Sequence, residues 1–115
     1  MSRLFIYGTL APGRPNHHIM ERIPGTWEEA SLKGTLLDEG WGSEMGCPGI
    51  VPSDDGSEVQ GFLFSSEQLA DHWQMLDEFE GEGYNRVPVL VKTRNGDMLE
   101  AQVYALNLSE SNVAE

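Results

Sequence analysis

The feature that most limits the possible folds is an Asn95-Gly96 pair between two segments of alternating hydrophobicity. Such a pair is the strongest short-range signal for a β-hairpin, so we expect strands over residues 87–93 and 98–106. Alternation in the second strand divides its side chains between two faces: Leu99, Ala101, Val103 and Ala105 on one, and Glu100, Gln102 and Tyr104 on the other. Pro88 lacks the N–H of a ladder hydrogen bond and should lie at a sheet edge or strand start.

Other segments also have the pattern of strands. Residues 4–7 form a short apolar run typical of a buried strand, and residues 25–37 are expected to form one or two strands. Residues 59–64 are a further strand, in which Gly61 would permit a close approach by another backbone. Between the last two lies a segment rich in Gly, Pro, Ser and Asp, residues 38–57. A loop of this length is often functional when ordered, so it could form one wall of a pocket.

Two features that invite a metal-binding or nucleophilic role are not assigned one. Residues 15–23 are expected to form a short helix with Asn16 as a possible cap. Its His17-His18 pair is not a metal site, because neighbouring helical residues do not share a face and no partner stands at a ligand spacing. Cys47 has no base beside it in the sequence, so we interpret it as a small buried residue.

The main helix is expected to follow Ser65. A hydroxyl cap there, with Gln68 three residues later, has the spacing of a capping box, and the helix should run to about Phe79. Its apolar residues recur at the spacing of one face turned toward a core: Leu69, Trp73 and Leu76.

Glu80 occupies the next position on that apolar face, at the point where Gly81 and Gly83 should end the helix. A carboxylate at the edge of an apolar surface is poorly solvated, so its pKa should rise above the roughly 4.3 of a free glutamate. A raised pKa suits a general base. The neighbouring acids lie off this face and are expected to be solvated: Asp77, Glu78 and Glu82.

Two stretches could bind a polar ligand. Gly8-Thr9-Leu10 follows the first strand, and its backbone N–H groups could hold a carboxylate or an oxyanion if Gly8 lets the chain bend into a nest. The alternative is an ordinary turn. Tyr84 and Arg86 should point to one face of a strand, where they could reach the same ligand. The alternative for these two is a rim tyrosine and a surface arginine.

Length and charge limit the functional classes. We expect a single domain over residues 1–106 and a polar tail over residues 107–115, in a chain of 115 residues. Seven basic and 19 acidic residues give a net charge of −12, which disfavours nucleic acid and anionic membranes as partners. One cysteine and the lack of a long apolar run indicate a cytoplasmic protein.

Four ordered motifs resemble those of the gamma-glutamylcyclotransferase-like superfamily, which includes gamma-glutamylamine cyclotransferases and plant proteins induced by avirulence genes. The motifs are Tyr7-Gly8-Thr9-Leu10, Cys47-Pro48-Gly49-Ile50-Val51, the V-x-G of residues 59–61, and L-D-x-x-E-G with Y-x-R over residues 76–86. The chain departs from many relatives at Cys47, where an aromatic residue is common, and at Phe62, where several have glutamate. Both changes would alter pocket walls and leave the proposed acid untouched.

This resemblance implies an α+β fold, a small mixed β-barrel with flanking helices. It also implies a reaction in which a gamma-glutamyl amide cyclises to 5-oxoproline and releases its amine, with no metal or cofactor. Glu80 matches the acid/base of the family. The substrate-binding positions are matched by Tyr7, Gly8, Thr9 and Leu10, and with less definite roles by Tyr84 and Arg86. A small gamma-glutamyl compound is thus the expected partner of a monomer or weak homodimer.

The residues fit this chemistry. The substrate's α-amine must lose a proton before it attacks, because its pKa of about 8 leaves it mostly protonated at neutral pH. Glu80 could take that proton and pass it to the leaving amine, while loop N–H groups stabilise the oxyanion.

The main alternative is a non-catalytic protein that senses a small ligand in the same pocket. A glycoside hydrolase is disfavoured, since the nearby acids share one helix surface. A structural interaction domain remains the simplest alternative. The sequence does not identify the released amine.

Overall fold

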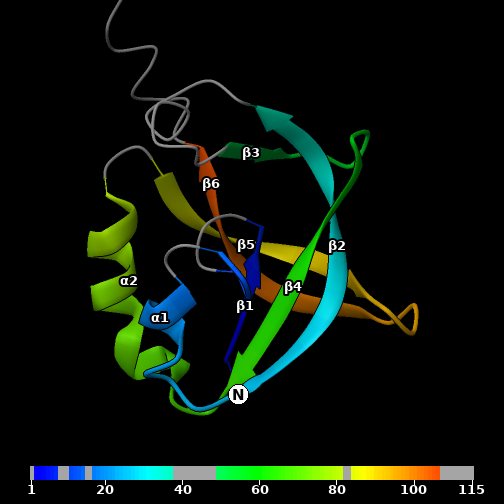
Figure 1. The fold of residues 1–115 in the computed structure, drawn as a ribbon. Helices are drawn as coiled ribbons and strands as arrows, with labels where there is room; N and C mark the ends of the chain where they lie inside the picture. The colour runs from blue at the N-terminus through cyan, green and yellow to red at the C-terminus, as the bar shows by residue number, and fades with distance from the viewer. Residues whose placement is uncertain (1, 8–10, 15–16, 38–48, 82–83, 107–115) are drawn as a thin grey trace, which may run out of the picture.

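The structure, a computed structural model, describes residues 2–7, 11–14, 17–37, 49–81 and 84–106. Its strands are β1 (Ser2–Ile6), β2 (Thr26–Leu37), β3 (Gly49–Pro52), β4 (Ser57–Ser66), β5 (Tyr84–Thr93) and β6 (Met98–Leu106). Its helices are α1 (His17–Met20), a 3-10 helix η2 (Leu69–His72) and α2 (Trp73–Glu80). Figure 1 shows the strands wrapped around one another, with α1 and α2 on one flank.

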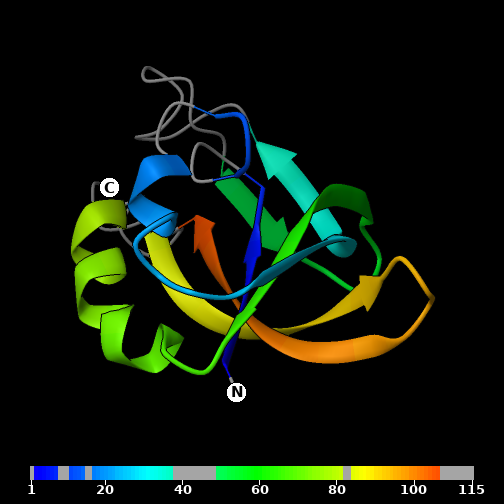
Figure 2. The same cartoon turned by 60° about the horizontal axis from the view of Figure 1, so that its bottom comes forward.

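The strands close into a small barrel. β1 pairs with β4, β4 with β2, β2 with β5, and β5 with β6, all antiparallel, and β6 returns to β1 in parallel. The short β3 lies between the ends of β2 and β6 and pairs with both. Figure 2 shows the closed ring with both helices against its outer side. The predicted mixed β-barrel with flanking helices is therefore confirmed.

Strand alternation builds two cores on the two faces of the barrel wall. The interior core is formed by Phe5, Ala30, Leu32, Ile50, Leu63, Val91, Ala101, Val103 and Ala105. The outer core lies between the wall and the helices and is formed by Leu4, Ile6, Ala11, Met20, Ile23, Phe64, Leu69, Leu76 and Tyr104. Since β1 contributes to both cores, its sequence is a continuous apolar run rather than an alternating one.

The predicted hairpin is confirmed. Lys92 and Met98 are opposite one another in the β5–β6 ladder, and the Gly96 N–H donates to the Thr93 carbonyl at 2.9 Å. Gly96 supplies the positive φ of the turn, at 92°. Pro88 lies opposite Gln102, where β5 pairs with β6 alone, so its expected edge position is also confirmed.

Three details differ from the expectations or sharpen them. Residues 26–37 form one continuous strand, and Gly49–Pro52 is a strand rather than loop, since it pairs with β2 and β6. Gly61 does permit a close approach: a Cβ there would lie 2.6 Å from the Ile6 carbonyl oxygen. Residues 38–48, with Cys47, and residues 107–115 lie outside the described residues, so the predictions for them stay untested.

The expected helix cap at Ser65 is wrong. Ser65 still belongs to β4, where it pairs with both β1 and β2. The hydroxyl of Ser66 instead accepts the N–H of Gln68 at 3.0 Å and donates to the Pro24 carbonyl. Pairing with β1 and β2 holds the backbone extended at Ser65, and pairing with Ser2 continues the strand through Ser66, so the chain turns one residue later and the 3-10 helix η2 follows.

Candidate active site

The C-terminal turn of α2 presents Glu80 as the apolar pattern predicted. Leu69 and Leu76 are fully buried, and Trp73 is partly buried against the same outer core. Glu80 is the last residue of α2, and its side chain is partly buried. Gly81 follows with φ 76° and donates its N–H to the Asp77 carbonyl at 3.0 Å, ending the helix. Residues 82–83 lie outside the described part of the chain.

Burial raises the pKa of the Glu80 carboxyl from 4.5 to about 7. The direction and the cause agree with the expectation from the sequence. A carboxyl group with this pKa exchanges its proton near neutral pH, so the group can both accept and donate a proton there.

This raised pKa predicts an unusual pH dependence of stability. Folded Glu80 binds more protons than unfolded Glu80 between pH 4.5 and about 7, so its contribution to stability is present below that window and lost as pH rises through it. The loss is at most about 1.4 kcal/mol per pH unit. In urea titrations we expect Glu80→Gln to be as stable as the wild type, or more stable, at neutral pH, with the difference shrinking toward pH 4.5.

The matched control is Glu78→Gln, which changes an exposed carboxylate on the same helix. It should leave the pH dependence of unfolding as in the wild type. If Glu80→Gln instead loses stability clearly at neutral pH, Glu80 is a structural hydrogen-bond or ion-pair partner, and the desolvation account is wrong.

Asp77 is exposed, as the sequence predicted, but its carboxylate also has partners that the sequence did not indicate. Its carboxylate accepts from Arg86 Nε at 2.9 Å, Arg86 Nη2 at 3.3 Å and Tyr104 Oη at 2.6 Å. These hydrogen bonds, above all those from Arg86, lower the pKa of Asp77, although partial burial acts in the opposite direction. Arg86 also lies over the Trp73 ring, with Cζ 4.4 Å from the ring centroid.

Tyr104 is the residue that reasoning from the sequence missed. It is buried, lies opposite Arg86 in the β5–β6 ladder, and donates to Asp77. Burial and the Asp77 hydrogen bond raise the pKa of its hydroxyl well above the ordinary range, and the charge of Glu80 adds to the rise. Tyr104 therefore stays protonated and acts as a donor. The available signal was a tyrosine among polar neighbours on the face of β6 opposite the small apolar residues.

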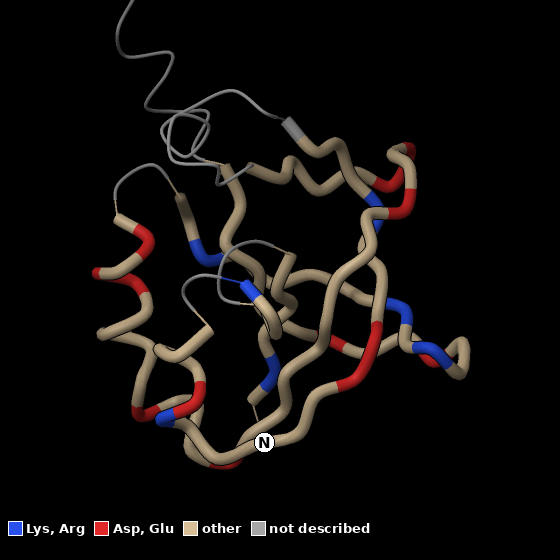
Figure 3. The backbone as a smooth tube through the Cα atoms, in the orientation of Figure 1, with Lys and Arg blue, Asp and Glu red and all other residues tan. Residues whose placement is uncertain are grey.

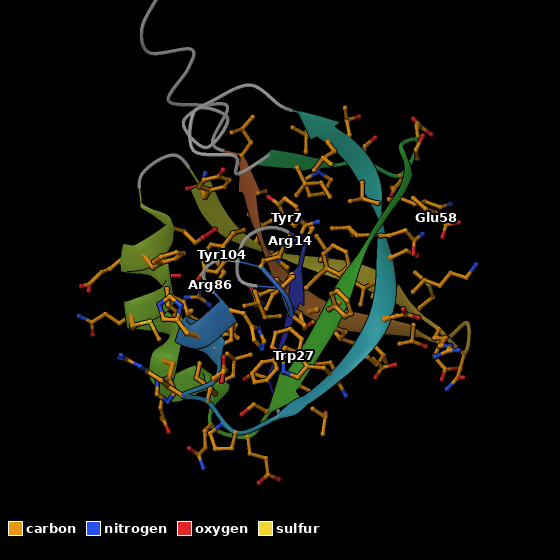
Figure 4. All side chains as sticks on the ribbon, viewed as in Figure 1. Tyr7, Arg14, Trp27, Glu58, Arg86 and Tyr104 are labelled. Carbon is orange, nitrogen blue, oxygen red and sulfur yellow. The ribbon has the colours of Figure 1, made fainter. Side chains whose placement is uncertain are left out.

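Tyr7 ties the first strand to this region. Its hydroxyl donates to the Tyr104 carbonyl at 2.7 Å and accepts the N–H of Ile50 at 3.1 Å, so it links β1 to β6 and β3. Figure 4 shows Arg86 and Tyr104 next to α2, with Tyr7 farther into the barrel. Residues 8–10, the other part of the predicted binding loop, lie outside the described residues, so their role stays a prediction.

The structure thus gathers several of the predicted site residues around Tyr104. Arg86 and Tyr104 both donate to Asp77, and the Tyr7 hydroxyl donates to the Tyr104 carbonyl. The charge of Glu80 raises the pKa of Tyr104. Tyr84 is the first residue of β5, and its partly buried ring packs on the outer core.

Two surface hollows lined by described residues lie elsewhere. The larger, of about 910 Å³, lies between β2 and β5, and the smaller, of about 580 Å³, lies along β2 and β4. Neither is lined by Glu80 or Tyr7, so we do not place the chemistry in them.

In the part of the chain that the structure describes, no three His, Cys, Asp or Glu side chains are grouped to hold a metal ion. No helix there is long and apolar enough to cross a membrane.

Comparisons with known proteins identify the family of the chain. A family model described as "Gamma-glutamyl cyclotransferase, AIG2-like" matches residues 4–115. YkqA of Bacillus subtilis is 30% identical over 106 residues, which cover 92% of this chain and 35% of YkqA. The gamma-L-glutamyl-butirosin B gamma-glutamyl cyclotransferase of Niallia circulans is 33% identical over 86 residues, which cover 75% of this chain and 52% of that protein. The chain therefore spans about a third and about half of these relatives.

Solved structures show the same fold. The crystal structure of YkqA matches with a TM-score of 0.69 at 32% identity, over 92% of this chain and 36% of that one. An AIG2-like protein from Mus musculus matches with a TM-score of 0.68 at 26% identity, over 91% of this chain and 76% of that one.

Proposed function

The chain belongs to the AIG2-like gamma-glutamyl cyclotransferase family, and we propose that it converts a gamma-glutamyl amide into 5-oxoproline with release of the amine. The observation that carries this proposal is Glu80, a partly buried carboxyl at the end of α2 whose pKa lies near 7. A group of that kind can take and return a proton at neutral pH.

In the proposed reaction, Glu80 removes a proton from the substrate's α-ammonium group. The neutral nitrogen then attacks the γ-carbonyl carbon of the same molecule, forming the ring bond, and the carbonyl oxygen gains negative charge. As this intermediate collapses, the bond to the leaving nitrogen breaks, and Glu80 gives that nitrogen its proton. The ring nitrogen then still carries one proton more than an amide, and Glu80 takes this proton and passes it to the released amine. The products are 5-oxoproline and a protonated amine, and the Glu80 carboxylate is regenerated.

The remaining groups would bind and orient the substrate. In this proposal the backbone N–H groups of Gly8, Thr9 and Leu10 hold the glutamyl portion and the developing oxyanion, and Tyr7 fixes the start of that loop through its hydrogen bonds to β6 and β3. Holding the glutamyl chain in a folded form supplies much of the acceleration, because the attack is intramolecular. Tyr84, at the start of β5, would contact the same ligand. The scheme uses no cofactor.

The test is a panel of gamma-glutamyl compounds that differ in the amine: amino acids, polyamines, the lysine side chain and glutathione. Each is incubated with the protein at neutral pH, 5-oxoproline is quantified, and the melting temperature is measured in parallel. We expect 5-oxoproline from at least one compound. A compound that raises the melting temperature while none is cyclised would support a small-ligand sensor instead.

A further inference from the structure

Three side chains next to Glu80 form a cluster that joins α2 to the barrel. Asp77 belongs to α2, Arg86 to β5 and Tyr104 to β6, and the last two are opposite one another in the ladder. The Asp77 carboxylate accepts from both, at 2.6 to 3.3 Å. Charge-assisted hydrogen bonds of this kind are stronger and more directional than neutral ones, so the cluster fixes how the last turn of α2 lies on the strands.

The guanidinium of Arg86 is committed to the protein on two sides. Nε and Nη2 donate to Asp77, and Cζ lies over the ring of Trp73, which belongs to the same helix. A guanidinium group with both of these contacts is held in one place, and both contacts are made to residues of α2. This geometry favours a role for Arg86 in holding the helix, rather than the contact with substrate that the sequence implied.

We propose that Asp77, Arg86 and Tyr104 are positioning residues that hold Glu80 in its working place and balance the charge around it; the inference rests on the proposed role of Glu80. Asp77 and Glu80 are three residues apart on α2, a spacing that places two side chains next to one another on a helix surface. Burial is the cause that raises the pKa of Glu80, and the charges of Asp77 and Arg86 do not add to it, as expected if the two opposite charges cancel at Glu80. Glu80 can then be deprotonated near neutral pH although acidic positions recur along α2 (Figure 3).

Other titratable side chains lie on the elements around α2. α1 lies beside α2 in both views of the fold, and its His17 ring lies 5.1 Å from the Trp27 ring, while His18 is exposed. Arg14, in the turn before α1, is exposed, as is Glu78 on α2. Tyr104 is a neutral donor, and the partly buried Tyr84 lies beside the end of α2, since its N–H donates to the Gly81 carbonyl at 3.4 Å. Among the described residues, the ion pair that includes a residue of α2 is Asp77–Arg86.

The test compares Asp77→Asn, Arg86→Gln and the double variant. The Glu80 carboxyl is titrated by ¹³C NMR, which needs no turnover. Arg86→Gln leaves the Asp77 charge unbalanced and should raise the Glu80 pKa, whereas Asp77→Asn leaves the Arg86 charge unbalanced and should lower it. The double variant should return toward the wild type. In assays of 5-oxoproline release, each single variant should lose roughly tenfold or more in kcat with little change in KM, because the base is misplaced.

The matched control is the exposed Arg94–Glu29 pair, whose closest atoms are 3.9 Å apart. Arg94→Gln and Glu29→Gln should move neither the Glu80 titration nor kcat.

Two outcomes would overturn the inference. If both single variants shift the Glu80 titration in the same direction, or leave it unmoved while lowering stability, the cluster is only structural. If Arg86→Gln raises KM with kcat unchanged and Asp77→Asn has no effect, Arg86 is a substrate ligand. Failure of the proposed function would give a different result: the wild-type protein would cyclise no compound, while the Glu80 pKa would still shift in the predicted directions in the variants.

Discussion

Replacing Glu80 with glutamine is expected to lower turnover by roughly a hundredfold or more. Glutamine keeps the size of the side chain and much of its hydrogen bonding, but it cannot take a proton from the α-ammonium group. Binding should largely survive, because the glutamine oxygen can still accept a hydrogen bond from the substrate's amino group and the backbone N–H groups of residues 8–10 would still hold the glutamyl portion. The rate of 5-oxoproline release gives the first half of this prediction, and calorimetry with a non-cyclising gamma-glutamyl analogue gives the second.

Glu78→Gln is the control, since Glu78 is an exposed carboxylate two residues earlier on α2. It should retain wild-type turnover and binding. Normal turnover by Glu80→Gln would show that Glu80 is not the base. Loss of binding together with activity would make Glu80 a ligand contact and would favour the sensor.

Leu76→Ala is expected to lower the free energy of unfolding by about 2–5 kcal/mol. Leu76 is fully buried in the outer core, where it joins α2 to the barrel wall one turn before Glu80. Truncation removes buried apolar area and leaves a cavity that the surrounding strands cannot readily fill. Urea unfolding measures the effect directly.

Leu90→Ala is the same substitution on β5 at a side chain that is 60% exposed, and it should change the free energy of unfolding by no more than about 0.5 kcal/mol. Similar losses for the two variants would mean that α2 does not pack on the barrel through Leu76 as the structure shows.

The features that could be predicted from the sequence are those encoded locally. The Asn95-Gly96 turn and its alternating arms gave the β5–β6 hairpin, and the Leu69, Trp73, Leu76 pattern placed Glu80 on the inner side of α2. Periodicity reports which face of an element is buried, and for Glu80 that was enough to predict the direction of its pKa and the cause.

The features that could not be predicted depend on pairing between distant segments. β3 is a strand because it pairs with β2 and β6, and Ser65 stays extended because it pairs with both β1 and β2. The Asp77 cluster arises where the β5–β6 register places Arg86 opposite Tyr104 beneath α2. Asp77 alone, off the apolar face, had no local signal that distinguished it from a solvated acid.

The central claim is that the substrate's own amine attacks within a site served by Glu80. The measurement that tests it most directly is the quantification of 5-oxoproline, glutamate and free amine released from one gamma-glutamyl amide by the wild-type protein and by Glu80→Gln. We predict equal amounts of 5-oxoproline and amine from the wild type, without glutamate, and a roughly hundredfold slower release of both from the variant. Glutamate in place of 5-oxoproline would show that water is the nucleophile, and equal rates for the two proteins would remove Glu80 from the mechanism.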